Sequence, residues 1–411
     1  MTPRFRHQPV IVPALIIAAA MFLIPVVLHP GQHSDLTVHE WGTFTSVAGE
    51  DGSAVDWDVL GCKDDLPEFV NDFGYRGLKW RLRSTVRMET PVMYFYSPRA
   101  VDVQVKVAFH QGLITEWYPR AEYEIYQADG VGGSARRLAA NLNGIDTSLR
   151  SVTGVMRWRD IHVRPGIAPD LPVESAASRY YAARDTDADP IAVGDQQEKF
   201  LFYRGVGRLP IPLTARLSGD GTIVVENRGR DPVPGVIVFE NRAGRIGYHD
   251  AGTIEGTVTL DPLSLDGSLP KVRSDLEAAL VARGLFPKEA HAMLETWHDS
   301  WFEEGSRLIY IMSSRAVDRI LPLEVDPVPS ATTRVFVGRI ELVTPETRRT
   351  VAEALAMSDW STLDRYGRFL DPILARIYSE GPAKARETER LLTHQQSVSA
   401  GSCCRVSPTC G

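Results

Sequence analysis

The chain has 411 residues and a formal net charge of -7, and 44% of its residues are hydrophobic. This length exceeds what a single hydrophobic core usually supports, so we expect two domains or one domain with a large appendage. The negative charge repels phosphate backbones and argues against nucleic acid as a partner.

The N-terminus combines positive charge with an apolar stretch. Two arginines fall within residues 1–9, and residues 10–28 carry no Asp, Glu, Lys or Arg. This pattern predicts that residues 1–9 stay in the cytoplasm and that the rest of the chain is exported to the periplasm or cell surface. The lack of small residues spaced for signal peptidase favours an uncleaved transmembrane anchor, with the membrane as a partner. The short apolar core between Pro13 and Pro25 is typical of a cleaved signal peptide, so both interpretations remain open.

Residues 35–262 carry the signals of antiparallel strands. Valine or phenylalanine alternates with other residues over 101–109, a period of two that is typical of a half-buried strand. Turns that contain Gly and Asp separate further short runs. The predicted hairpins comprise residues 213–217 with 223–226 and residues 236–240 with 245–248. Short strands joined by such turns predict a β-sandwich-like region.

Helical signals dominate residues 263–392. Ser274 and Glu277 have capping-box spacing, and Pro287 suits the first turn of a second helix. The other predicted elements are strands at 307–312 and 334–343, a helix from Thr344, and a helix from Ser361 that Pro372 kinks. The predicted fold class is therefore α+β, mainly an antiparallel β-sandwich followed by a mixed, helix-rich C-terminal part. Residues 393–411 form a flexible tail in this prediction.

The four cysteines are Cys62, Cys403, Cys404 and Cys410. In an oxidising compartment an even number indicates disulfides, with three pairings left open, although unpaired tail thiols remain an alternative. The three tail thiols also suggest a soft-metal site. Their spacing matches no common zinc or copper pattern, so no metal site is predicted.

One acidic residue stands in an apolar segment. Residues 36–47 read LTVHEWGTFTSV, and a regular strand there points four side chains to one side, namely Leu36, Val38, Glu40 and Phe44. A carboxylate on that apolar face must pair with an arginine, accept backbone hydrogen bonds or take up a proton. A structural pair with one of the arginines in residues 76–87 is one interpretation, and a catalytic role for Glu40 is the other.

A second unusual acid belongs to the predicted helix over residues 287–304. The apolar face of that helix consists of Met293, Leu294, Trp297 and Trp301, and Glu304 projects within the same arc. His298 lies at the edge of the face, and with Glu295 it has the i, i+3 spacing of carboxylate-bridged metal sites. A single motif of this kind favours an edge-of-core histidine over a metal ligand.

Together, Glu40 and Glu304 give a catalytic hypothesis. Two carboxyl groups whose surroundings separate their pKa values can act as acid and base, so the pair predicts a periplasmic hydrolase in which His298 or His39 assists. The leading expectation is different, namely a binding or scaffolding role at the cell envelope for a ligand that the sequence does not specify. Trp41 and Trp117 are predicted to lie in the core or in a cleft where the two parts of the chain meet.

Acidic residues crowd residues 50–72, which supply oxygen ligands suited to calcium in an exported protein. The spacing fits no EF-hand loop. A solvated acidic loop that the following basic run partly neutralises is the preferred interpretation, and no other cofactor is predicted.

Several segments resemble a family of exported bacterial proteins to which no activity is assigned. They are VHEWGTFTSVAG (38–49), VRMETPVMYFYSP (86–98), ITEWYP (114–119), FLFYRGVG (200–207), TWHDSWFEEG (296–305) and FVGRIELVTPE (336–346). The resemblance covers about residues 37–370 and excludes the cysteine-rich tail. It implies export and one continuous ectodomain, and it supplies no catalytic residue.

Overall fold

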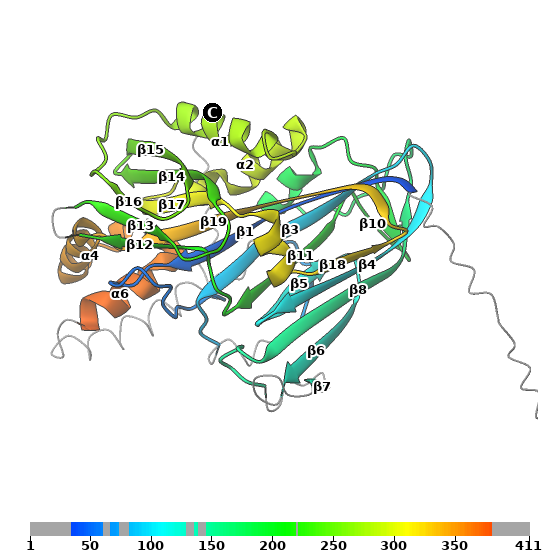
Figure 1. Cartoon of the computed structure of the whole chain (residues 1–411), viewed down its shortest axis with the longest axis horizontal. Helices are drawn as coiled ribbons and strands as arrows, with labels where there is room; N and C mark the ends of the chain where they lie inside the picture. Colours follow the sequence, from blue (N-terminus) through cyan, green and yellow to red (C-terminus); the bar gives the residue numbers. More distant parts are fainter. Residues whose placement is uncertain are drawn as a thin grey trace, which may run out of the picture. The chain divides into compact units, whose positions relative to one another are not determined.

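The computed structural model describes residues 34–60, 66–73, 82–128, 135–138, 145–218 and 221–379. These residues belong to one compact unit. Their main feature is a mixed sheet of sixteen described strands (Figure 1). Its main path runs β10 (Gln196–Glu198), β9 (Ile191–Val193), β8 (Val152–Val163), β5 (Gly112–Tyr118), β11 (Leu201–Gly207), β3 (Val86–Tyr96), β1 (Ser34–Val47), β19 (Pro329–Leu342), β17 (Gly305–Ile311), β14 (Val233–Arg242) and β15 (Arg245–Ile254).

The sheet branches at β8 and β5. The branch strands are β4 (Val101–His110) beside β8, β18 (Leu323–Asp326) beside β4, β6 (Glu122–Ala128) beside β8, β7 (Ala135–Arg137) beside β6, and β2 (Asn71–Asp72) beside β5. A separate three-stranded sheet contains β12 (Leu213–Leu217), β13 (Ile223–Asn227) and β16 (Thr257–Leu260).

The predicted antiparallel β-sandwich is wrong. β1 pairs in parallel with β19 from Ser34 opposite Pro329 to Val47 opposite Glu341, while its other edge pairs antiparallel with β3. The sheet thus runs across residue 262, where the sequence suggested a change from strands to helices. Local alternation predicts that a segment is a strand, but it carries no information about a partner hundreds of residues away.

The individual strands agree better with the prediction. β4 covers the alternating run, and the two predicted hairpins are β12 with β13 and β14 with β15. β1 also keeps its expected alternation, because Leu36, Val38 and Phe44 lie in one core. The local bulge lies on β3, where Thr90 has a positive φ of 38°, so β1 itself stays regular.

The helices are α1 (Leu269–Val281), α2 (Pro287–Trp301), α3 (Ser314–Ile320), α4 (Pro345–Met357), α5 (Trp360–Asp364) and α6 (Leu370–Ser379), with 3₁₀ segments η2 (Arg179–Arg184) and η3 (Gly367–Phe369). α1 begins before Ser274, because Pro270 already occupies its first turn. α4 begins as predicted, and the Thr344 side chain accepts a hydrogen bond from the Thr347 amide. α5 is capped by Asp359 instead of Ser361.

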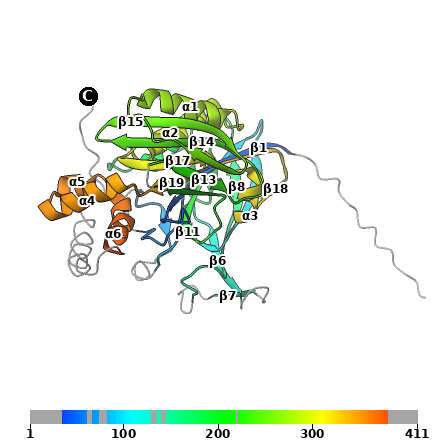
Figure 2. The same ribbon diagram turned by 60° about the vertical axis from the view of Figure 1, so that its left-hand side comes forward.

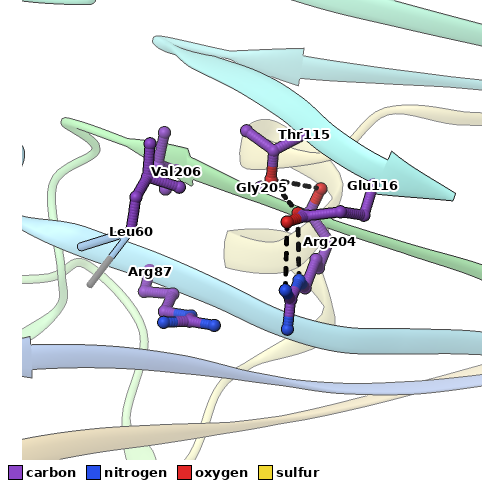
Figure 3. Close-up of a pocket in the computed structure, with 7 residues that line it drawn as sticks. All are labelled: Leu60, Arg87, Thr115, Glu116, Arg204, Gly205 and Val206. Atoms are coloured by element: carbon purple, nitrogen blue, oxygen red, sulfur yellow. Dashed lines mark hydrogen bonds and ion pairs between the residues drawn. The ribbon is translucent and has the colours of Figure 1, made fainter. Parts of the chain in front are cut away.

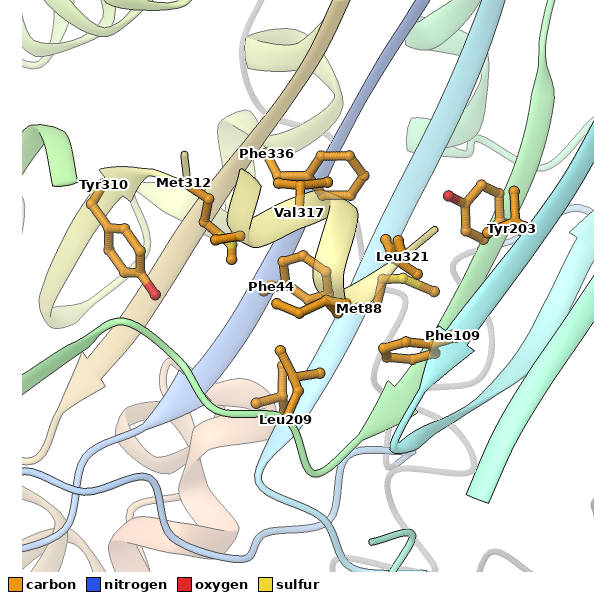
Figure 4. Packing of buried hydrophobic residues seen from close by; sticks show 14 of the residues in the cluster. Phe44, Met88, Phe109, Tyr203, Leu209, Tyr310, Met312, Val317, Leu321 and Phe336 are labelled. Carbon is orange, nitrogen blue, oxygen red and sulfur yellow. The ribbon is translucent and has the colours of Figure 1, made fainter. Parts of the chain in front are cut away.

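Two apolar cores lie on opposite faces of the central strands. On one face, Figure 4 shows Phe44, Met88 and Phe336 from β1, β3 and β19 beside Val317 of α3. The Phe44 and Phe336 rings stack with centroids 5.4 Å apart. On the other face, α1 and α2 pack on a core that contains Trp41, buried with Trp297 and Trp301 as predicted. Trp117 is buried in the first core.

A third apolar core lies beneath the C-terminal helices. α4, α5 and α6 gather at one end of the sheet (Figure 2). Trp57, Phe369 and Ile373 are among its buried side chains. This core completes the cover of the sheet on that end.

The structure gives no support to two other predictions. Within the described ranges, no helix has the length and apolar character needed to cross a bilayer. The predicted transmembrane helix over 10–28, the four cysteines and the tail all lie outside those ranges. The structure therefore shows neither the transmembrane helix nor a disulfide, and we carry neither forward.

Candidate functional site

Glu40 forms a buried ion pair, but with a different arginine from those expected. Its carboxylate is fully buried and accepts hydrogen bonds from Arg334 Nε at 2.6 Å and from the Tyr203 hydroxyl at 2.5 Å. Arg334 comes from β19, which lies directly beside Glu40 in the parallel register. The same guanidinium also donates to Asp318 and to the Leu321 carbonyl. Burial and then the Glu40 charge raise the pKa of Tyr203 well above its ordinary value, so Tyr203 acts as a donor.

His39 belongs to a second buried cluster on the opposite face of β1. Its Nδ1 lies 2.8 Å from a carboxylate oxygen of Glu289 in α2. Glu289 is fully buried and also accepts hydrogen bonds from the Tyr96 hydroxyl and the Phe286 amide, each at 2.7 Å. The Phe286 ring covers the imidazole at a centroid distance of 4.4 Å. A carboxylate at Nδ1 fixes the ring orientation and leaves Nε2 as the nitrogen that can exchange a proton with another group.

Glu304 has a structural environment of another kind. α2 ends at Trp301, so the helical projection that placed Glu304 on the apolar face does not extend to it. Both of its carboxylate oxygens accept from the Ala243 amide at 3.0 Å, in the turn between β14 and β15. The side chain is partly exposed and stabilises that turn.

The structure does not bring Glu40 and Glu304 together. Glu304 precedes β17, whose residue Arg307 pairs with Glu341, and Glu341 in turn lies opposite Val47 of β1. Seven residues of strand separate Val47 from Glu40, which corresponds to roughly 23 Å. His298 is exposed, and its Nδ1 contacts the Glu295 carbonyl at 2.8 Å.

A buried row of charged side chains was missed by the sequence reasoning. Arg307 and Arg339 are both 0% exposed, and both contact Glu341, at 3.0 and 3.2 Å. Glu303 accepts from Arg339 at 2.8 Å. This row joins β17 and β19 to the end of α2.

The row continues across β1 and β3. The Glu89 carboxylate on β3 pairs with Arg368 and accepts a hydrogen bond from the Thr45 hydroxyl of β1 at 2.6 Å. Figure 3 shows the next step, where Arg204 of β11 pairs with Glu116 of β5 around a narrow pocket that Arg87 also lines. A usable signal was present in the sequence, because Arg87 and Glu89 share one face of an otherwise apolar strand.

The acidic residues expected to suit calcium have separate partners. Asp51 closes its own turn through the Ser53 amide, Asp56 pairs with Arg208, and Glu50 lies 3.2 Å from Arg376. Over the described parts of the chain, no three His, Cys, Asp or Glu side chains are arranged to hold a metal ion. Calcium at residues 50–72 stays a prediction.

The chain matches no protein-family model and no curated protein.

Proposed function

We propose that this chain is an exported protein of the cell envelope with a binding or scaffolding role. The basic, apolar N-terminus supports export. The observation that carries the binding role is the Glu40–Arg334 pair. A carboxylate held by an arginine and a tyrosine in a closed core contributes to the fold and has no access to a substrate.

The arrangement of the other acids supports the same proposal. Glu304 stabilises a turn, and Glu341 and Glu89 neutralise buried arginines. These charges tie distant strands together in one large sheet. A rigid sheet with several exposed edges and faces suits a protein whose task is to present a surface.

Export is tested with a reporter that is active only outside the cytoplasm. Alkaline phosphatase is fused after residue 60, with residues 1–33 either present or deleted. We expect activity only when residues 1–33 are present, because the apolar stretch directs translocation. Equal activity of both fusions, or accumulation of the full chain in the cytosol, contradicts the proposal.

The binding role is tested in the native host with Glu304→Gln. Glutamine keeps an oxygen that accepts from the Ala243 amide, so a deletion strain that carries this variant should behave as wild type. If the variant is stable and abundant but fails to complement the deletion, Glu304 has a chemical role and the binding proposal is wrong.

A further inference from the structure

An open groove of about 230 Å³ lies over three adjacent strands, β18, β4 and β8. A bulge in β8 shapes it. Val103 lies opposite Ile161 while Val105 lies opposite Trp158, so β8 has one extra residue between these pairs. Asp160 in the bulge has a φ of 55°, a left-handed conformation that costs energy in a residue with a side chain. Bulges are enriched next to functional sites, where they locally part the strands.

Ion pairs hold the rim of the groove in place. Lys106 donates to Glu324 at 2.7 Å across the β4–β18 pair. Arg159 donates to Glu122 at 2.8 Å on the β6 side. These charges are balanced within each pair, so the groove presents no excess of one sign that would select an ionic ligand.

Two polar side chains in the groove have no such partner. Gln104 and Asp326 are direct neighbours in the register of β4 and β18, and both line the groove. Among the described residues, neither side chain has a hydrogen bond or an ion pair. The amide supplies one donor group and one acceptor, and the carboxylate supplies acceptors.

Apolar surface complements these groups. Val105, Trp158 and Val325 line the groove between the polar side chains. A pyranose ring has the matching character, since it carries apolar C–H faces and hydroxyl groups that both donate and accept hydrogen bonds. The volume is below the 300–1,000 Å³ range of pockets for drug-sized ligands, which suits one ring better than a long ligand.

We propose that this groove binds a single ring of a neutral saccharide. Asp326 and Gln104 hydrogen-bond its hydroxyl groups, and the ring lies on the apolar strip beside Trp158. This assignment rests on the proposed binding role and names its ligand class.

The test uses the folded full chain and saturation-transfer NMR with four probes. The probes are the methyl glycosides of glucose, mannose and galactose, and N-acetylglucosamine, each at about 10 mM because single-ring ligands bind weakly. We expect saturation transfer to at least one probe. Asp326→Asn and Gln104→Ala should each weaken that binding about tenfold, since hydrogen bonds to charged or polar groups are lost.

A matched control is available on the same face. Asp102→Asn removes an exposed carboxylate two residues before Gln104, outside the groove lining, and should leave sugar binding unchanged. No saturation transfer to any probe, or equal binding by Asp326→Asn and wild type, overturns the assignment. The export assay does not involve the groove, so an exported chain that ignores all four sugars refutes the saccharide site and leaves the envelope role standing.

Discussion

Individual acids in this protein are placed so that their charge is used twice or three times. Glu40 accepts from Arg334 and Tyr203, Glu289 accepts from three donors, and Glu341 contacts two arginines. Transfer of such groups from water is costly, and it is offset only when every lone pair finds a donor. Loss of a single partner therefore leaves a charge that the interior does not solvate.

The Glu40→Gln variant should be strongly destabilised. The change leaves the Arg334 guanidinium without its buried counter-ion, and we expect a loss of about 3–5 kcal/mol of unfolding free energy in urea denaturation. The control is Glu226→Gln, which removes a pair with Arg228 whose carboxylate side chain is 46% exposed and should change stability little. Equal stability of the two variants would refute a structural role for Glu40.

Glu89 should make the protein sensitive to acid. Burial alone would raise its pKa, but the Arg368 and Arg87 guanidiniums and the Thr45 hydroxyl hold it below the ordinary value. A carboxyl group with a lower pKa in the folded chain stabilises the fold above its unfolded pKa of about 4.3, and this contribution disappears as the pH falls through the folded pKa.

We therefore expect the unfolding free energy to decrease below about pH 4.3 in the wild type and to decrease less in Glu89→Gln. Denaturation curves recorded at a series of pH values measure this difference. Glu226→Gln serves again as the control and should follow the wild-type slope. Parallel slopes for wild type and Glu89→Gln would contradict the assignment.

At the scale of elements, β19 has the central position. It pairs with β1 on one edge and with β17 on the other, and it supplies Arg334 and Arg339 to opposite faces of the sheet. Its Gly338 lies opposite Tyr310 of β17. A Cβ at residue 338 would lie 2.0 Å from the Tyr310 ring, so the tyrosine fills the space that the glycine leaves.

The Gly338→Ala substitution should weaken the sheet. The methyl group displaces a buried ring, and overpacking of this kind costs about 1–3 kcal/mol. Gly256→Ala is the matched control, because no atom lies within 4 Å of its added Cβ. Thermal unfolding compares the two variants, and an unchanged melting temperature for Gly338→Ala would show that the β17–β19 packing differs from the structure.

At the scale of the whole molecule, the fold depends on contacts between the two ends of the described chain. β1 begins at Ser34, and its parallel partner β19 begins at Pro329. Nearly the entire chain must be present before this pairing forms, because closure of so long a loop has to precede it.

A chain that ends at residue 326 should therefore fail to fold cooperatively. It lacks β19, so β1 and β17 would each expose an unpaired edge. A chain that ends at residue 379 keeps every described element and should unfold in one transition, as judged by circular dichroism and limited proteolysis. A cooperative transition in the shorter chain would show that β19 is dispensable.

The sequence alone determined the local features of this protein. Alternation located β4 and the two hairpins, capping residues located the start of α4, and helical spacing identified the buried face of α2, because these patterns depend on neighbours within a few residues. It also identified Glu40 as an acid that needs a buried partner.

Only the tertiary structure decided which residues meet. Arg334 replaced the expected arginines as the partner of Glu40, Glu304 fell beyond the end of α2, and His39 found Glu289 on a helix 250 residues away. The reason is physical, since pairing across a sheet and between its faces depends on strand order and register, which distant segments set together. The same long-range pairing joined two predicted regions into one mixed sheet.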